Sequence, residues 1–149
     1  MEEQEIIQTF YDTGALLEGH FLLRSGLHSN KFFQAALLLQ YPRLAQQLCA
    51  TVADQFRDFD IETVLAPATG GIIVGQEIAR ALGTRSIFAE KSENDQLALR
   101  RNFSIREGER ILVAEDVVTK GGRVKQTIDL VRAGGAVPVG VAVLADRSE

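Results

Sequence analysis

The sequence contains very little cysteine, no long hydrophobic run and no excess of basic residues, and each absence excludes a class of protein. The single cysteine, Cys49, excludes an internal disulfide and argues against a metal site built on thiolates. Apolar residues such as Leu48 and Val52 recur around it at helical spacing, so Cys49 is predicted to be a small residue of a helix. The only histidines, His20 and His28, have no third ligand nearby in sequence, and we expect them to be solvated or hydrogen-bonded rather than metal-bound.

The chain also lacks signals for export, membrane insertion and general nucleic-acid binding. It begins M-E-E-Q-E, without the basic and then apolar layout of a signal peptide. No apolar run approaches the roughly 20 residues that a membrane span needs. A net charge of −4 leaves no excess of basic charge for nucleic acid. We therefore expect a soluble cytoplasmic protein whose partners include neither membrane nor nucleic acid.

From Ile61 onward, short apolar strands alternate with helices, which predicts an α/β fold. The alternation implies a parallel sheet flanked by helices, with right-handed crossovers. Strands are expected at residues 63–66, 86–89, 111–114 and 137–145, and helices at 72–82 and from about Val124 to Val131. Residues 90–96, E-K-S-E-N-D-Q, are wholly polar and are predicted to form an exposed loop.

The first 40 residues do not follow this alternation and are predicted to form a small hood with a hairpin. A helix is expected over residues 2–13, then a hairpin with strands near 21–23 and 31–36, then a helix from Pro42 through Phe59. We predict one domain over residues 1–149, divided into a hood (1–41) and a core (42–149). The last strand ends close to Glu149, which fits either a missing C-terminal end or a naturally short form.

The candidate site centres on the stretch I-L-V-A-E-D-V-V-T-K-G-G-R, residues 111–123. Glu115 and Asp116 follow an apolar strand, where two acids are costly to desolvate unless they bind something. Their oxygens can accept hydrogen bonds from a sugar diol or hold a metal ion through water. The loop 117–122 and the helix start after it offer N–H groups to an anion, and Thr119 is a candidate helix cap.

Two further strand ends carry unusual residues. Gly70 and Gly71 precede a helix and permit close approach of a phosphate, although a Gly-Gly pair is often a simple turn. Arg147 follows the last strand and offers a planar fork for a carboxylate or an imide edge, although alone it would be an ordinary surface arginine. Because parallel strands end at one edge of a sheet, the three ends together favour a site for phosphate, sugar and an anionic group.

The hairpin supplies a fourth element, R-S-G-L-H-S-N-K-F-F, which places Arg24 near a turn. Phe32 and Phe33 are adjacent, so their side chains point to opposite faces of a strand. One phenyl can enter the core while the other faces a ligand, and two ordinary packing aromatics fit the spacing equally well.

Residues 111–123 resemble the phosphoribosyl pyrophosphate signature of type I phosphoribosyltransferases. The segment G-H-F-L-L-R-S-G-L-H-S-N-K-F-F and the closing A-D-R-S are similar to those of the orotate phosphoribosyltransferases. The resemblance covers about Gly14 to Ser148. It implies that ribose 5-phosphate passes from phosphoribosyl pyrophosphate to orotate, with Mg²⁺ bound mainly through the donor pyrophosphate and with no metal ligands of the protein's own. It also implies a homodimer with shared active sites.

The resemblance assigns roles to individual positions. Catalytic roles fall to Lys91 and Arg100, near a polar loop that would reach into the neighbouring subunit, and to Asp116. Orotate would contact Arg24, Phe33, Thr119 and Arg147. The donor would be bound by Thr69, Gly70, Gly71, Glu115, Asp116, Val117, Val118, Thr119, Lys120, Gly121, Gly122 and Arg123.

Some positions depart from the family pattern. Lys120 and Arg123 stand where small or hydroxyl residues are common, Gly70 stands where many relatives have lysine, and the polar loop lacks a lysine-rich motif. These differences suggest a branch with a shorter loop. Three alternatives stay open: transfer to a purine or uracil base, a regulatory protein that binds nucleic acid on the same fold, and a folded but inactive chain.

Overall fold

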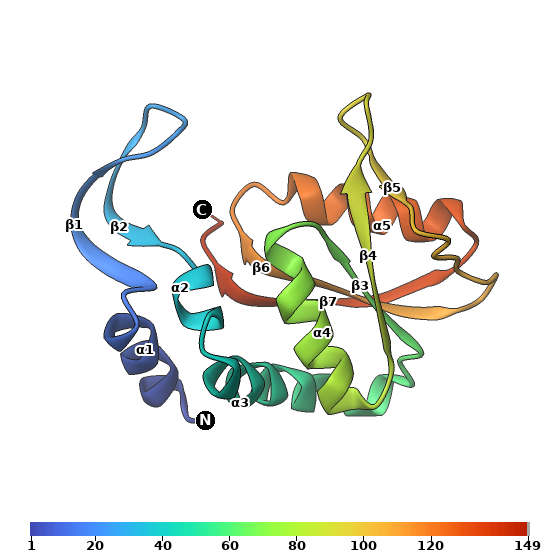
Figure 1. The fold of residues 1–149 in the computed structure, drawn as a ribbon, viewed down its shortest axis with the longest axis horizontal. Coiled ribbons are helices and arrows are strands. Elements are labelled where there is room, and N and C mark those ends of the chain that lie inside the picture. Colours follow the sequence, from blue (N-terminus) through green and yellow to red (C-terminus); the bar gives the residue numbers. More distant parts are fainter. Residues whose placement is uncertain (149) are drawn as a thin grey trace.

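The computed structural model describes residues 1–148, which form a two-stranded hairpin and a larger five-stranded sheet (Figure 1). The strand order of the larger sheet is β5-β4-β3-β6-β7, with β5 antiparallel and the other four strands parallel. The predicted α/β fold is therefore confirmed. The question of whether Glu149 ends the natural chain lies outside the described residues. The strands are β3 (Thr63–Pro67), β4 (Arg85–Lys91), β5 (Leu97–Leu99), β6 (Arg110–Val118) and β7 (Val137–Asp146).

The helices cover both faces of this sheet, because alternate strand residues point to opposite sides. Val64 and Ala66 face the cluster that contains α3 (Pro42–Ala53) and α4 (Gly70–Leu82). Leu65 faces the other cluster, with α5 (Gly122–Ala133). None of the helices within residues 1–148 is long and apolar enough to cross a membrane.

The chain order of the parallel strands creates a crevice at the centre of the sheet. From β3 the chain crosses through α4 to β4, and from β6 it crosses through α5 to β7, so the two connections run in opposite directions. The neighbouring strands β3 and β6 thus flank the point where the strand order reverses. Ligands of open α/β sheets bind at the carboxyl ends of the strands at this point.

The N-terminal part consists of α1 (Glu3–Asp12), β1 (Leu16–Leu22), β2 (His28–Phe33) and α2 (Ala36–Leu39). The predicted hairpin is present, but both of its strands begin earlier than expected, and the second ends at Phe33, so that Ala36 already belongs to α2. The helical turn of α2 buries both Leu38 and Leu39, which an extended chain would point in opposite directions. His20 Nε2 lies 2.8 Å from His28 Nδ1, so the two histidines are hydrogen-bonded, as expected.

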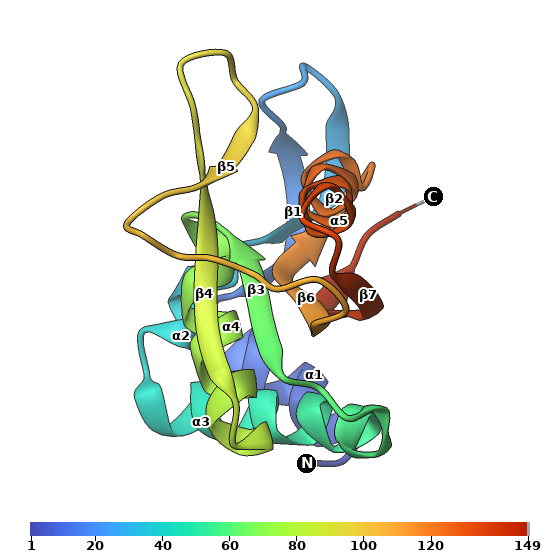
Figure 2. The ribbon, with the colours of Figure 1, turned by 90° about the vertical axis from the view of Figure 1, so that its right-hand side faces the viewer.

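The polar segment after Ala89 forms a hairpin rather than a loop of seven residues. Strand β4 continues through Glu90 and Lys91, which pair with Ala98 and Leu97 of β5. Only the residues between the strands turn, closed by a 2.7 Å hydrogen bond from Ser92 N to Gln96 O. Figure 1 and Figure 2 both show this hairpin and β1–β2 projecting past the same end of the molecule.

The opposite, amino-terminal end of the large sheet is held by a polar network. The carboxylate of Glu109 is 3% exposed and accepts hydrogen bonds from Thr63 Oγ1 at 3.2 Å and Arg85 Nη2 at 3.1 Å. Arg85 Nε also donates to Thr63 Oγ1 at 2.8 Å. Since the network joins residues at the starts of β3 and β4 to the residue before β6, it fixes these strands relative to one another.

Candidate active site

Glu115 and Asp116 stand near the end of β6, beside the crevice, as the sequence predicted. The Glu115 side chain is 4% exposed, whereas Asp116 is half-buried. Burial and a side-chain hydrogen bond with Asp116 raise the pKa of Glu115 to about 7, while the positive charge of Arg123 acts in the opposite direction. The two neighbouring acids therefore differ in environment. Asp116 is the one that solvent, and thus a ligand, reaches more easily.

The turn between β3 and α4 packs directly against these acids. A Cβ added at Gly70 would lie 2.5 Å from Asp116 Oδ2, and one at Gly71 would lie 3.1 Å from Glu115 Oε1. The peptide bond between Ala68 and Thr69 is cis. Any larger residue at these two positions would crowd the carboxylates, because the turn and the acids share one space, so the Gly-Gly pair is more than a simple turn.

The loop between β6 and α5 encloses a cavity of about 200 Å³ lined by Glu115, Arg123 and most of the residues between them. β6 extends through Val118, so the loop is shorter than predicted and Val117 and Val118 belong to the strand. The predicted cap was wrong: the N-cap of α5 is Gly121, at φ 77°, and no side chain caps it. The N–H groups of the helix start are thus left to a ligand such as a phosphate.

Arg123, in the first turn of α5, reaches across the crevice. Its Nη2 donates a hydrogen bond to the carbonyl of Ala68, and its Nε lies 3.6 Å from Glu115 Oε2. One side chain therefore joins the β3–α4 turn to the acidic pair.

A second cavity, of about 690 Å³, lies between the β1–β2 hairpin and the β6–α5 loop. Arg147, Thr119 and Lys120 line this cavity together with hairpin residues that are far from them in sequence. Arg147 also donates a 3.5 Å hydrogen bond to the carbonyl of Lys31. The sequence reasoning missed the hairpin residues that line this cavity, because it treated S-G-L-H-S only as a turn. They are Leu23, Ser25, Leu27, His28 and Ser29.

Two residues predicted to contact the acceptor, Arg24 and Phe33, do not line the second cavity. Arg24 is exposed at the hairpin turn, next to residues that line the second cavity but not among them. Phe33 packs edge-on against Phe10, with ring centroids 5.1 Å apart, while Phe32 stacks near Phe21 on the other face. The phenyl that enters the core is thus that of Phe33, and its role toward a base stays a prediction.

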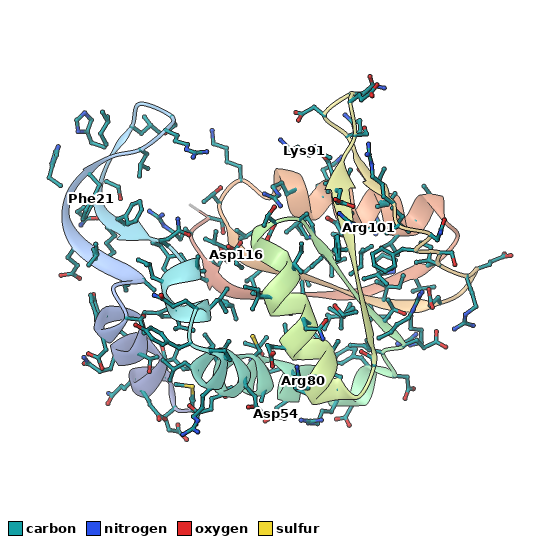
Figure 3. The ribbon with its side chains drawn as sticks, viewed as in Figure 1. Phe21, Asp54, Arg80, Lys91, Arg101 and Asp116 are labelled. Carbon is teal, nitrogen blue, oxygen red and sulfur yellow. The ribbon has the colours of Figure 1, made fainter. Side chains whose placement is uncertain are left out.

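Lys91 and Arg100 lie on the β4–β5 hairpin, on the other side of the crevice from β1–β2. Figure 3 shows Lys91 near the hairpin tip and Asp116 at the centre of the molecule, so the two are not in contact. Lys91 pairs with Asp95 at 2.9 Å and is 61% exposed. Arg100 is exposed. Within residues 1–148, neither residue forms a hydrogen bond or ion pair with the acidic pair.

Three arginines that follow one another closely in sequence, Arg101, Arg106 and Arg110, do not form one basic patch. Arg106 pairs with Glu62, and Arg110 donates to the carbonyl of Phe59, both at the amino-terminal end of the sheet. Arg101 pairs with Glu90 on the β4–β5 hairpin. Arg101 lies apart from the other two, and Arg101 and Arg106 are each paired with an acid, which weakens the case for a nucleic-acid-binding surface.

Residues 34–149 match the family model described as the phosphoribosyl transferase domain. The matched segment contains the crevice, the acidic pair and the loop that encloses the smaller cavity. The fold and the site therefore define the class as a phosphoribosyltransferase.

Two curated relatives are similar over almost the whole chain. The orotate phosphoribosyltransferases of Desulforamulus reducens and Pelotomaculum thermopropionicum are each 51% identical over 148 residues, which is 99% of this chain and 77% of the relative. A solved structure of orotate phosphoribosyltransferase from Aeropyrum pernix shares the fold, with a TM-score of 0.75 and 20% identity over 95% of this chain and 93% of that one. The chain belongs to the phosphoribosyltransferase family, in its orotate phosphoribosyltransferase branch.

Proposed function

We propose that this chain transfers ribose 5-phosphate from phosphoribosyl pyrophosphate to orotate, giving orotidine 5′-phosphate and pyrophosphate in pyrimidine synthesis. One observation carries the proposal. A chain half identical to orotate phosphoribosyltransferases brings an acidic pair, a phosphate loop and a glycine turn together where the strand order reverses.

On the donor side, each part of the crevice suits one part of the molecule. The N–H groups of residues 119–122 would hold the 5-phosphate in the smaller cavity. Asp116, the more accessible acid, would accept hydrogen bonds from the ribose hydroxyls. Glu115, the buried acid, would help to position the Asp116 side chain through their hydrogen bond. The N–H groups of residues 69–71 would bind the pyrophosphate across the crevice.

On the acceptor side, the second cavity is the proposed base site. Arg147 can present its guanidinium fork to the carboxylate or the imide edge of orotate, which a neutral purine lacks. Thr119 lies at the junction of the two cavities, where the anomeric carbon of the donor would meet the ring nitrogen. Arg24 and Phe33 stay predicted acceptor contacts: Arg24 adjoins residues that line this cavity, whereas the Phe33 ring packs against Phe10.

In this reaction the protein mainly has to stabilise charge on the ribose and hold the ribose in position relative to the base. Breaking the anomeric bond gives the ribose oxocarbenium character, as in glycosyl transfer generally. A carboxylate at the ribose hydroxyls offsets this charge and fixes the ring against the base.

The residues present fit a Mg²⁺ ion that is held mainly by the donor. Within residues 1–148 no cluster of three metal-ligating side chains occurs, so a cage made by the protein alone is not part of the proposal. The two carboxylates at the crevice can meet a hydrated Mg²⁺ through water, as this ion prefers. When bound, the ion would neutralise charge on the departing pyrophosphate.

We also infer that the chain works as a homodimer in the cytoplasm, with the β4–β5 hairpin acting in the partner's site. Lys91, on the β4–β5 hairpin, lies apart from Asp116 in Figure 3, and this hairpin projects past the same end of the molecule as β1–β2. Arg100 directly follows β5 and is exposed. Mixing Lys91→Ala and Asp116→Asn chains tests this arrangement. Recovery of activity in the mixture supports shared sites, and no recovery contradicts them.

The transfer itself is tested by following orotate absorbance with phosphoribosyl pyrophosphate and Mg²⁺. Orotate should be consumed, and adenine, hypoxanthine and uracil should not. Consumption of another base alone would refute the assignment of the acceptor. Loss of absorbance that is equally fast without the donor would refute the transfer.

A further inference from the structure

The turn that faces the acidic pair carries no positive charge of its own. Its sequence is Ala68-Thr69-Gly70-Gly71. A side chain at Gly70 would require the Asp116 carboxylate to shift, because a Cβ there would lie 2.5 Å from Asp116 Oδ2. Any cation that serves an anion bound at this turn must therefore come from another element.

Arg123 brings such a cation to the turn from the opposite wall of the crevice. Its guanidinium contacts the Ala68 carbonyl and the Glu115 carboxylate, while its side chain remains 45% exposed. Guanidinium has five N–H donors, and the contacts seen within residues 1–148 use those on Nε and Nη2. A solute in the crevice can thus reach the group.

The position of Arg123 is electrostatically unfavourable without an anion. A helix N-terminus carries a partial positive charge, which disfavours a cation in the first turn. Glu115 offsets part of this repulsion at a nitrogen–oxygen distance of 3.6 Å, too long for a close ion pair. A phosphate group would meet the guanidinium fork and the helix N–H groups together, so an anionic ligand suits this corner better than Glu115 does.

We propose that Arg123 binds the pyrophosphate group of the donor, and that in the free protein Ala68 and Glu115 hold it across the crevice until the donor displaces them. This inference rests on the proposed transfer function and names the leaving group as the partner of Arg123. The competing partner is the 5-phosphate, because Arg123 also lines the smaller cavity. The contact with Ala68 favours the pyrophosphate, since Ala68 belongs to the β3–α4 turn on the far side of the crevice.

The proposal also concerns the reaction. Negative charge on the pyrophosphate grows as the anomeric bond breaks, so a fixed guanidinium at that group stabilises the transition state more than the bound donor. Removing Arg123 should consequently lower kcat as well as weaken the binding of the donor.

Calorimetry with the two halves of the donor tests the assignment without turnover. The probes are pyrophosphate with Mg²⁺ and ribose 5-phosphate, measured on the wild-type chain, Arg123→Ser and Arg123→Lys. The matched control is Lys125→Ser, which removes one positive charge from the same helix at a residue that pairs with Asp129 at its surface. Thermal unfolding of each variant checks that the fold is retained, and Arg123→Lys preserves the charge if the serine variant fails to fold.

We expect Arg123→Ser to weaken the affinity for pyrophosphate at least about tenfold, because a charge-assisted hydrogen bond is lost. The affinity for ribose 5-phosphate should change less than about twofold. Arg123→Lys should restore part of the loss, and Lys125→Ser should bind both probes like the wild type. A larger loss for ribose 5-phosphate than for pyrophosphate would overturn the assignment, as would unchanged binding of both. A wild-type chain that binds neither probe would refute the proposed function itself.

Discussion

The buried carboxyl of Glu115 should make the protein less stable as the pH rises through neutrality. Its pKa is raised from 4.5 to about 7 in the folded chain, chiefly by burial. Between these two values the unfolded chain has lost the proton that the folded chain still holds. Stability therefore falls as the pH rises across this window and levels off above about 7.

The size of the effect follows from the shift. At about 1.4 kcal/mol for each pKa unit, a rise from 4.5 to about 7 corresponds to about 3 kcal/mol at pH 8. Glu115→Gln keeps the shape but cannot ionise. It should therefore unfold at a higher urea concentration than the wild type at pH 8, with the gain shrinking toward pH 5.

Urea unfolding of both chains at several pH values from 5 to 8 measures this difference directly. Glu62→Gln is the control, because Glu62 is exposed and its pKa is lowered, first by the backbone N–H of Arg110 and then by Arg106. Its stability difference from the wild type should stay constant over the same range. Parallel wild-type and Glu115→Gln profiles would refute the view that the site keeps a destabilising carboxylate.

Three further outcomes are expected. Asp116→Asn should fold normally but lose at least about tenfold in turnover, since it removes charge at nearly constant size; near wild-type turnover would contradict the ribose role. Arg147→Ala should weaken the binding of orotate more than the binding of the donor in calorimetry. Equal losses of affinity for the two ligands would count against a place for Arg147 in the base site. The Cys49 thiol should stay unreactive toward a disulfide reagent until the chain unfolds, because burial, and then the charge of Glu77, raises its pKa to about 12; rapid labelling of the native protein would argue against that burial.

Much of the large sheet could be predicted because its strands are short apolar runs between clear breaks. Thr63, Ile111 and Val137 each start or nearly start a strand where the pattern changed. Two of the errors, the ends of β6 and β4, have one cause. Val118 and Lys91 lie in segments that look polar or irregular, but pairing with a neighbouring strand extends β6 and β4 through them. Pairing is a tertiary interaction, which a local pattern does not contain.

The site could be located from the sequence but not assembled from it. The acidic pair and the two glycines were recognised separately, yet their packing requires Gly70 and Asp116 to share one space. The direction of Arg123 was also beyond prediction, since a first-turn arginine can point to solvent as easily as into a crevice. Hairpin residues such as Ser25 and Ser29 carried no local signal, because the cavity that they line together with the β6–α5 loop depends on the tertiary position of the hairpin.

The hydrogen-bond network of Arg85, Thr63 and Glu109 stabilises the end of the sheet opposite to the ligand site. It lies at the starts of the strands whose other ends carry the site, about 13 Å away along the five residues of β3. An engineer could therefore seek thermostability at this end, and altered base preference at the other, with little interference between the two sets of substitutions.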